Sequence, residues 1–241
     1  MPHLRSDTTP YQFYRVAPPG VMLVTVPFDL AEYSLAAVDR ELARLWERVD
    51  SLVERNVDRI VLAGVPVAAA LGRDRTLEIA ELITRRTGLP AGSDLESHVM
   101  AAHHLGVSTM AMATRWSDGV NEALRAYMAE AGIEVVSVAS RPRDLEQNKA
   151  ADPNEDHRLM LALGRRAVRE PPALPDALFL PGGLGLVVDV AAILEEELQL
   201  PVFTNATSTL WAALRGHPGA VQTDGTTYPS RLLATLARST Q

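Results

Sequence analysis

Short apolar runs alternate with amphipathic helical patterns along most of this chain, and this alternation constrains the fold more than any other feature. Strands that alternate with helices indicate parallel sheets with helices on both faces. The sequence therefore predicts an α/β protein. The predicted strands are Val21 to Pro27, Arg59 to Gly64, Ser108 to Thr114, Ile133 to Ala139, Ala177 to Leu180 and Pro201 to Thr204.

Two strand–helix series follow one another, which suggests two similar Rossmann-like lobes, each with a small parallel sheet. We place the first lobe at residues 1–107 and the second at 108–205, with residues 206–241 crossing back to complete the first lobe. Glycines end several helices, Gly88 among them. The predicted helices cover residues 36–55, 74–88, 95–105, 117–132, 153–169, 187–198 and 208–216.

The chain has 241 residues, a formal net charge of −7 and no cysteine. The acidic balance argues against a nucleic-acid partner, because nucleic-acid-binding domains usually carry a basic stripe. Without cysteine, the chain cannot form a disulfide, a thiolate metal site or a thiol nucleophile. We find neither an apolar signal core nor a run of about 18 apolar residues, so we expect a cytoplasmic protein with no membrane partner.

Ligands of such sheets bind beyond the carboxyl ends of the strands, where turns expose backbone N–H groups and helix N-termini. The turn after Leu180 reads PGGLG, and its Gly182 and Gly183 can present N–H donors to an anion. Pro181 enters this turn without an acid, a base or a nucleophile. The turn lacks the spacing of a nucleotide-binding fingerprint, and an ordinary strand–helix turn is the equal alternative.

Two other strand ends carry polar candidates for ligand contact. Thr114 ends a strand in the segment ATRWSDGVNE, which also contains Trp116 and Asn121. Asn205 lies in the segment TNATST, whose hydroxyl and amide groups suit a carboxylate. For both segments, helix capping is the alternative reading.

These segments resemble the aspartate/glutamate racemase superfamily. The resemblance rests on the strand–PGGL–helix–LPV order and on ATRWSDGVNEALRAYMAEAGI, and it is nearest to the arylmalonate decarboxylase and maleate cis–trans isomerase branch. It covers residues 60–215, with VAPPG at residues 16–20 as a weaker match to the first strand turn. The resemblance implies two lobes related by a pseudo-twofold axis, with a small-carboxylate site in the cleft between them, and a homodimer or higher homo-oligomer.

The reactive residues of the family are replaced in this chain. The resemblance implies one cysteine on each lobe, and these positions fall on Gly64 and Pro181. The paired hydroxyl residues of the decarboxylase fall on Val65 and Pro66, and its aromatic hydroxyl falls on Trp116. The predicted substrate-binding set is Pro19, Gly64, Val65, Pro66, Thr114, Trp116, Asn121, Pro181, Gly182, Gly183 and Asn205.

Acids and bases near the third strand end of the first lobe could take over proton transfer. Asp94 and Glu96 lie where that strand meets its helix, and His98 lies in the first turn of the helix. The alternatives are charges favoured by the helix dipole and a surface histidine. Asp29 and Tyr33 are further candidates to line the cleft. We expect no metal site, because the adjacent His103 and His104 point in different directions on a helix.

The favoured function is that of a lyase or isomerase that needs no cofactor and acts on a small carboxylic acid through an enolate or carbanion. Decarboxylation is favoured, because desolvation can expel a carboxylate and one proton donor then suffices. One alternative is an isomerase, racemase or cyclase of the same fold with a different acid–base pair. The other is a carboxylate-binding protein without catalytic activity.

Overall fold

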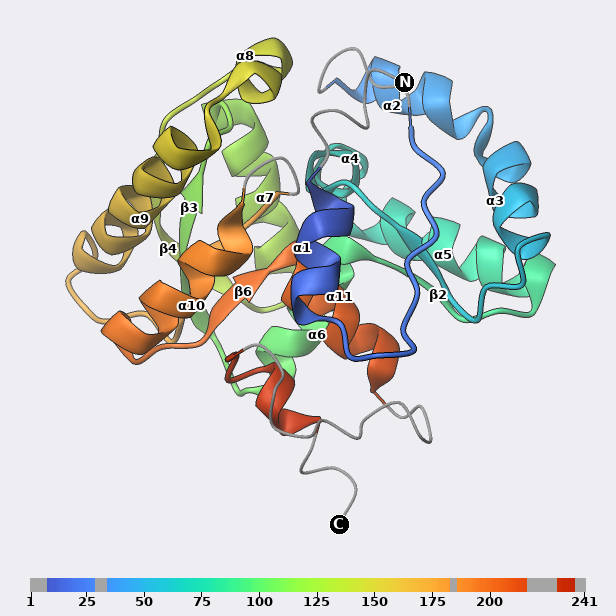
Figure 1. Ribbon diagram of the computed structural model, residues 1–241. Coiled ribbons are helices and arrows are strands. Elements are labelled where there is room, and N and C mark those ends of the chain that lie inside the picture. The colour runs from blue at the N-terminus through green and yellow to red at the C-terminus, as the bar shows by residue number, and fades with distance from the viewer. Residues whose placement is uncertain (1–7, 29–33, 183–185, 216–228, 237–241) are drawn as a thin grey trace.

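The computed structural model describes residues 8–28, 34–182, 186–215 and 229–236. Its strands form two parallel sheets, so the predicted α/β class is confirmed (Figure 1). The smaller sheet pairs β1 (Ile60–Leu62) with β2 (Ala91–Ser93). The larger sheet has the order β4 (Glu134–Ser140), β3 (Thr109–Thr114), β5 (Ala177–Leu180) and β6 (Val202–Thr204).

The larger sheet is buried on both faces, as expected for parallel strands covered by helices. Along β3, Met110 and Met112 join one core cluster, while Ala111 and Ala113 join another on the opposite face. The alanine face packs against α9 (Pro153–Arg169) and α10 (Val187–Leu198). Gly164 lets these two helices approach, because a Cβ there would collide with Leu194 Cδ1.

The other face of the larger sheet contributes to the largest core cluster of the described residues. The helices that supply this cluster are α1 (Thr9–Val16), α4 (Val65–Leu71), α6 (Asp94–His104), α7 (Asp118–Glu130) and α11 (Asn205–Leu214). Helix α11 packs against α6 and α1, and the Arg59 side chain donates to the Ala212 carbonyl at 2.8 Å. The end of α11 therefore contacts the first half of the chain, while the proposed lobe boundaries stay a prediction.

The smaller sheet packs against α5 (Arg73–Thr87), which ends at Gly88 in the left-handed region, as predicted. The predicted helix over residues 36–55 is two helices, α2 (Leu35–Leu42) and α3 (Leu45–Val53). The connection between β4 and α9 contains the short helix α8 (Leu145–Ala150), which Asp144 and Gln147 cap reciprocally.

The prediction of a strand at residues 21–27 is wrong. These residues form no strand, and the helix α1 precedes them. Val21 and Leu23 pack against the core beside α1, whereas Met22 is 77% exposed. The Leu23 N–H donates to the Tyr14 hydroxyl at 3.0 Å. A side chain therefore supplies the hydrogen-bond acceptor that a neighbouring strand would supply in a sheet. The alternation of apolar residues has a real cause here, since one side of the segment faces the core, but the segment pairs with no sheet.

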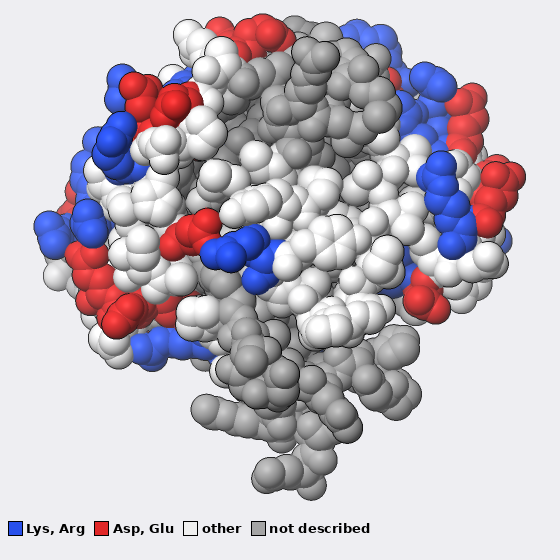
Figure 2. Space-filling view, viewed as in Figure 1, with Lys and Arg blue, Asp and Glu red and all other residues white. Residues whose placement is uncertain are grey.

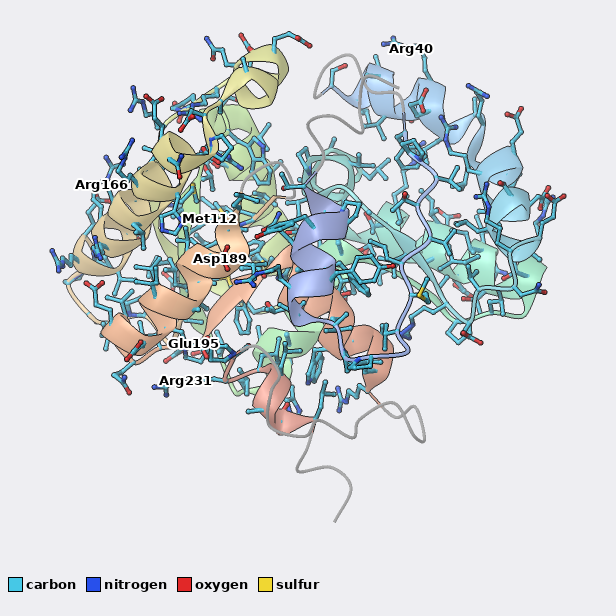
Figure 3. The ribbon with its side chains drawn as sticks, viewed as in Figure 1. Arg40, Met112, Arg166, Asp189, Glu195 and Arg231 are labelled. Carbon is cyan, nitrogen blue, oxygen red and sulfur yellow. The ribbon has the colours of Figure 1, made fainter. Side chains whose placement is uncertain are left out.

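Helix α1 lies between the two halves of the molecule, in front of α11 (Figure 1). The surface over α1 is mostly uncharged, apart from the ion pair of Arg15 with Asp189 (Figure 2). The segment 229–236, which ends in the short 3₁₀ helix η2 (Leu233–Thr235), is attached to α10 (Figure 3). There the buried Glu195 accepts from the backbone N–H groups of Val202 and Arg231. No helix among the described residues combines the length and the apolar character needed to cross a bilayer.

Candidate functional site

The carboxyl ends of four strands meet in one hydrogen-bonded network. Asp94, at the start of α6, accepts from the Gly64 N–H at 2.8 Å and from Asn205 Nδ2 at 3.0 Å, both at its Oδ2. The Oδ1 of Asn205 accepts from the Gly182 N–H at 3.1 Å and lies 3.2 Å from His98 Nε2. These residues follow β1, β2, β5 and β6, so the network joins the two sheets at the carboxyl ends of their strands, where α/β proteins bind ligands.

The network fixes which nitrogen of His98 carries its proton. Asn205 Nδ2 donates to Asp94, so its Oδ1 is the acceptor that faces both Gly182 and His98. His98 Nε2 must then be the N–H donor, because an acceptor oxygen requires a hydrogen between the two atoms. His98 Nδ1 is left with a lone pair and has no hydrogen-bond partner among the described residues.

Asp94 is buried, and its two carboxylate oxygens differ in their hydrogen bonding. Its Oδ2 receives two donors, whereas its Oδ1 has no hydrogen-bond partner within the described part of the chain. Burial raises the pKa of Asp94 to about 6, against the opposing effect of the Gly64 N–H. When this carboxyl is protonated, its hydrogen therefore belongs on Oδ1, because Oδ2 already accepts twice. Asp94 is an acid that titrates close to neutral pH.

His98 is fully buried and stays neutral. Its ring lies against Phe179 with centroids 4.3 Å apart. Burial lowers the pKa of His98 to about 3, and the hydrogen bond to Asn205 only partly opposes this effect. The imidazole is therefore a weak base at neutral pH, and its contribution at this site is a fixed N–H donor and an apolar ring face.

Thr114, Asn121 and Trp116 form a second, smaller network at the end of β3. Thr114 Oγ1 donates to Asn121 Oδ1 at 2.8 Å, and Asn121 Nδ2 donates to the Trp116 carbonyl at 3.2 Å. The Trp116 ring lies over Gly182, where an added Cβ would stand 3.2 Å from Trp116 Cζ2. The polar groups of Thr114 and Asn121 thus satisfy each other and hold the turn, and the indole covers the backbone at Gly182.

Glu96 is not brought together with Asp94 and His98. Its carboxylate forms a two-point ion pair with Arg73, at 2.8 and 3.1 Å, and accepts from the Tyr127 hydroxyl at 3.2 Å. It lines a separate pocket of about 280 Å³ together with Ser93 and Ser97. The helical period explains the separation, because residues two apart on a helix point in different directions, whereas residues four apart share a face.

Of the two glycine amides predicted to hold an anion, that of Gly182 already has a partner within the protein, and Gly183 lies outside the described residues. The Gly182 N–H is bound to Asn205, and the Val188 N–H in the first turn of α10 donates to Gln12 Oε1 at 3.2 Å. The Arg15 side chain pairs with Asp189 in the same turn at 2.8 Å (Figure 3). An anion would have to displace these groups. Sequence reasoning missed Gln12. The one signal in the sequence is that Leu186, which precedes α10, has no polar side chain to cap the helix, so another residue must supply the acceptor.

The remaining predicted residues have varied surroundings. Val65 and Pro181 are buried, Gly64 and Pro66 are half-buried, and Pro19 is exposed in the turn after α1. Gly183, Asp29 and Tyr33 lie outside the described residues. No group of three or more potential metal-ligating side chains occurs among the residues that the structure describes.

A family model for arylmalonate decarboxylase matches residues 16–228 of this chain. The chain belongs to the arylmalonate decarboxylase family. Among characterised proteins, it is similar to arylmalonate decarboxylase of Bordetella bronchiseptica, with 28% identity over 180 residues, 70% of this chain and 73% of that protein. The predicted resemblance is confirmed, although this member of the arylmalonate decarboxylase family has no cysteine.

Several solved structures share the fold. A crystal structure of arylmalonate decarboxylase matches with a TM-score of 0.78 at 22% identity, over 96% of each chain. A liganded double mutant of that enzyme matches with a TM-score of 0.81 at 21% identity, over 95% of this chain and 94% of the other. Nocardia farcinica maleate cis–trans isomerase bound to TRIS gives 0.78 at 16% identity, over 97% of this chain and 96% of the other.

Proposed function

We propose that this member of the arylmalonate decarboxylase family decarboxylates a small malonate-type acid without a thiol, and that Asp94 supplies the proton. The observation that carries the proposal is the Asp94 carboxyl group. It lies at a strand end beside the Gly64 backbone, its Oδ1 has no hydrogen-bond partner among the described residues, and its pKa is about 6. A general acid works best when its pKa lies near the working pH.

The reaction balances with the residues of this chain and water. The bond between the α-carbon and one carboxylate breaks, CO₂ leaves, and the electron pair remains on the α-carbon and the second carboxylate as an enediolate. The proton on Asp94 Oδ1 then passes to the α-carbon, and Asp94 takes a proton from water to complete the cycle. Each step uses a side chain or a water molecule, so the proposal requires no cofactor.

The groups around Asp94 have positioning roles in this proposal. Asn205, after β6 of the larger sheet, donates to Asp94 Oδ2, and the Gly64 N–H, after β1 of the smaller sheet that also precedes Asp94, donates to the same oxygen. The Trp116 ring at Gly182 and the buried Val65 side chain, next in the chain to Gly64, add apolar groups to the ends of the strands that form the network. An apolar site favours loss of the carboxylate charge as CO₂, since a desolvated anion is destabilised relative to a neutral product.

The test is CO₂ release from a panel of aryl- and alkylmalonates, run in deuterated water. We expect one deuterium at the α-carbon of the product, and we expect Asp94→Asn to lower turnover by about 100-fold or more. The matched control is Glu122→Gln, which removes an exposed carboxylate from α7. Absence of turnover across the panel, or full activity of Asp94→Asn, would contradict the proposal.

The same experiment separates this reading from the alternatives. An isomerase or racemase would exchange the α-proton of a substrate that keeps all its carbon atoms. A carboxylate-binding protein would gain thermal stability from the acids without forming product. The cysteine positions of the family, occupied here by Gly64 and Pro181, offer no nucleophile for a covalent isomerisation, which is why decarboxylation is preferred.

A further inference from the structure

A second hollow lies away from the Asp94 network, where β4 is followed by its connection to α9. It has a volume of about 540 Å³ and is open to solvent. Three of its lining residues are arginines, and a single carboxylate accompanies them. The lining consists of Arg141, Arg143, Glu155, Arg158, Leu159 and Ala162.

Two of the three arginines of this hollow differ from Arg165 and Arg166 of α9 in their ion pairing. Arg165 pairs with Glu197 at 2.8 Å, and Arg166 pairs with Glu170 at 3.1 Å. By contrast, Arg141 and Arg158 have no carboxylate oxygen within 4.0 Å in the part of the chain that the structure describes. Their guanidinium groups are exposed at the hollow without an opposing charge of their own.

A buried ion triad forms the base of the hollow. The Asp156 carboxylate, only 4% exposed, pairs with Arg115 through Oδ2 and with Arg143 through Oδ1 at 2.9 Å. The triad is largely withdrawn from water, so the attraction between its charges is screened less than that of a surface ion pair. The triad also holds the Arg143 side chain in place beside the two exposed arginines.

We propose that this hollow binds a small molecule carrying at least two negative charges, on phosphate or on several carboxylate groups. The guanidinium fork matches both groups, because it can donate two parallel hydrogen bonds to their oxygens. Glu155 also lines the hollow, and its carboxylate repels anions. This repulsion offsets much of the attraction that the arginines exert on a single negative charge, so we expect the ligand to carry at least two. The proposal does not depend on the reaction assigned to Asp94.

The hollow is connected to the turn that carries Trp116. Arg115 directly precedes Trp116, and the Arg143 N–H donates to the Arg115 carbonyl at 2.8 Å. A ligand that engages Arg143 is therefore linked to Trp116 through one backbone hydrogen bond and one peptide bond. Tryptophan emission supplies an optical readout of binding that is separate from catalytic activity.

The test is titration calorimetry of the whole chain with pyrophosphate, citrate and acetate. We expect saturable one-to-one binding of pyrophosphate or citrate, and no saturable binding of acetate. Tighter binding of pyrophosphate assigns a phosphate ligand, and tighter binding of citrate assigns a polycarboxylate. Arg141→Gln and Arg158→Gln should each weaken binding by about tenfold, since each removes a charge-assisted hydrogen bond.

The control is Arg55→Gln, which makes the same charge change at an exposed position after α3. It should leave the affinity within about twofold of the parent chain, because only long-range attraction changes. Equal weakening by Arg55→Gln and Arg158→Gln would show unspecific attraction and overturn the proposal. So would the absence of saturable binding for both polyanions. Thermal unfolding of each variant verifies that the fold is intact.

Discussion

At the scale of single residues, the proposed chemistry depends on how one buried carboxyl group, that of Asp94, is held. The sequence identified Asp94 and His98 as candidates, because both follow a strand end on the same helix. It grouped Glu96 with them, although the helical period already separated residue 96 from residues 94 and 98. What the sequence could not reveal is the partner of each oxygen, since Gly64 and Asn205 are far from Asp94 along the chain.

The state of Asp94 leads to a pH prediction for the proposed decarboxylation. The acid must be protonated to act, and its pKa is about 6. We therefore expect kcat/KM to level off below pH 6 and to fall above it, by about tenfold per pH unit, until another proton donor takes over. The measurement is the pH–rate profile, and the falling limb should disappear from the residual activity of Asp94→Asn. A profile that stays flat from pH 5 to pH 8 would argue against Asp94 as the acid.

At the scale of elements, most helices and strands could be predicted because their apolar periods match their burial. The strands β3 and β5 and the helices α9 and α10 lie where the pattern placed them. The N-terminal segment could not be predicted, since residues 21–27 alternate like a strand while packing beside α1. Tertiary contacts such as that of Leu23 with Tyr14 decide between a strand in a sheet and an extended segment packed on the core, and the local sequence does not reveal them.

Helix α1 also supplies the cap that α10 lacks. Gln12 is 3% exposed, and its Oε1 accepts from the buried Val188 N–H. Replacing Gln12 with alanine leaves that N–H without this acceptor, so we expect a loss of about 1–2 kcal/mol in the free energy of unfolding. Urea denaturation measures this loss. Tyr11→Ala is the matched control on the same helix, because Tyr11 is 53% exposed, and its effect should be smaller.

At the scale of the whole molecule, two buried groups make opposite contributions to stability as the pH changes. The pKa of Asp94 rises from 3.8 to about 6 on folding, so the folded state binds this proton more tightly, and stability falls as the pH increases from 4 to 6. The pKa of His98 falls from 6.5 to about 3, so the folded state binds this proton less tightly, and stability rises from pH 3 to 6.5. The two trends oppose each other between pH 4 and 6.

Variants should separate these two contributions. Asp94→Asn keeps the shape of the protonated carboxyl, and we expect its unfolding free energy to rise with pH over 4–6 by an amount on the order of 3 kcal/mol more than in the parent chain. His98→Gln should show the reverse, a fall over the same range. Denaturation curves at several pH values measure both slopes. Identical slopes in all three proteins would mean that neither group changes its pKa on folding.

The packing of α1 against α10 has a consequence for engineering this protein. Helix α1 precedes most of the segment that matches the family, yet Gln12 and Arg15 hold the first turn of α10. A receptor domain fused ahead of α1 would therefore act on the first turn of α10 through these two contacts. Such a fusion would change the docking of α1 without substituting any residue of the Asp94 network.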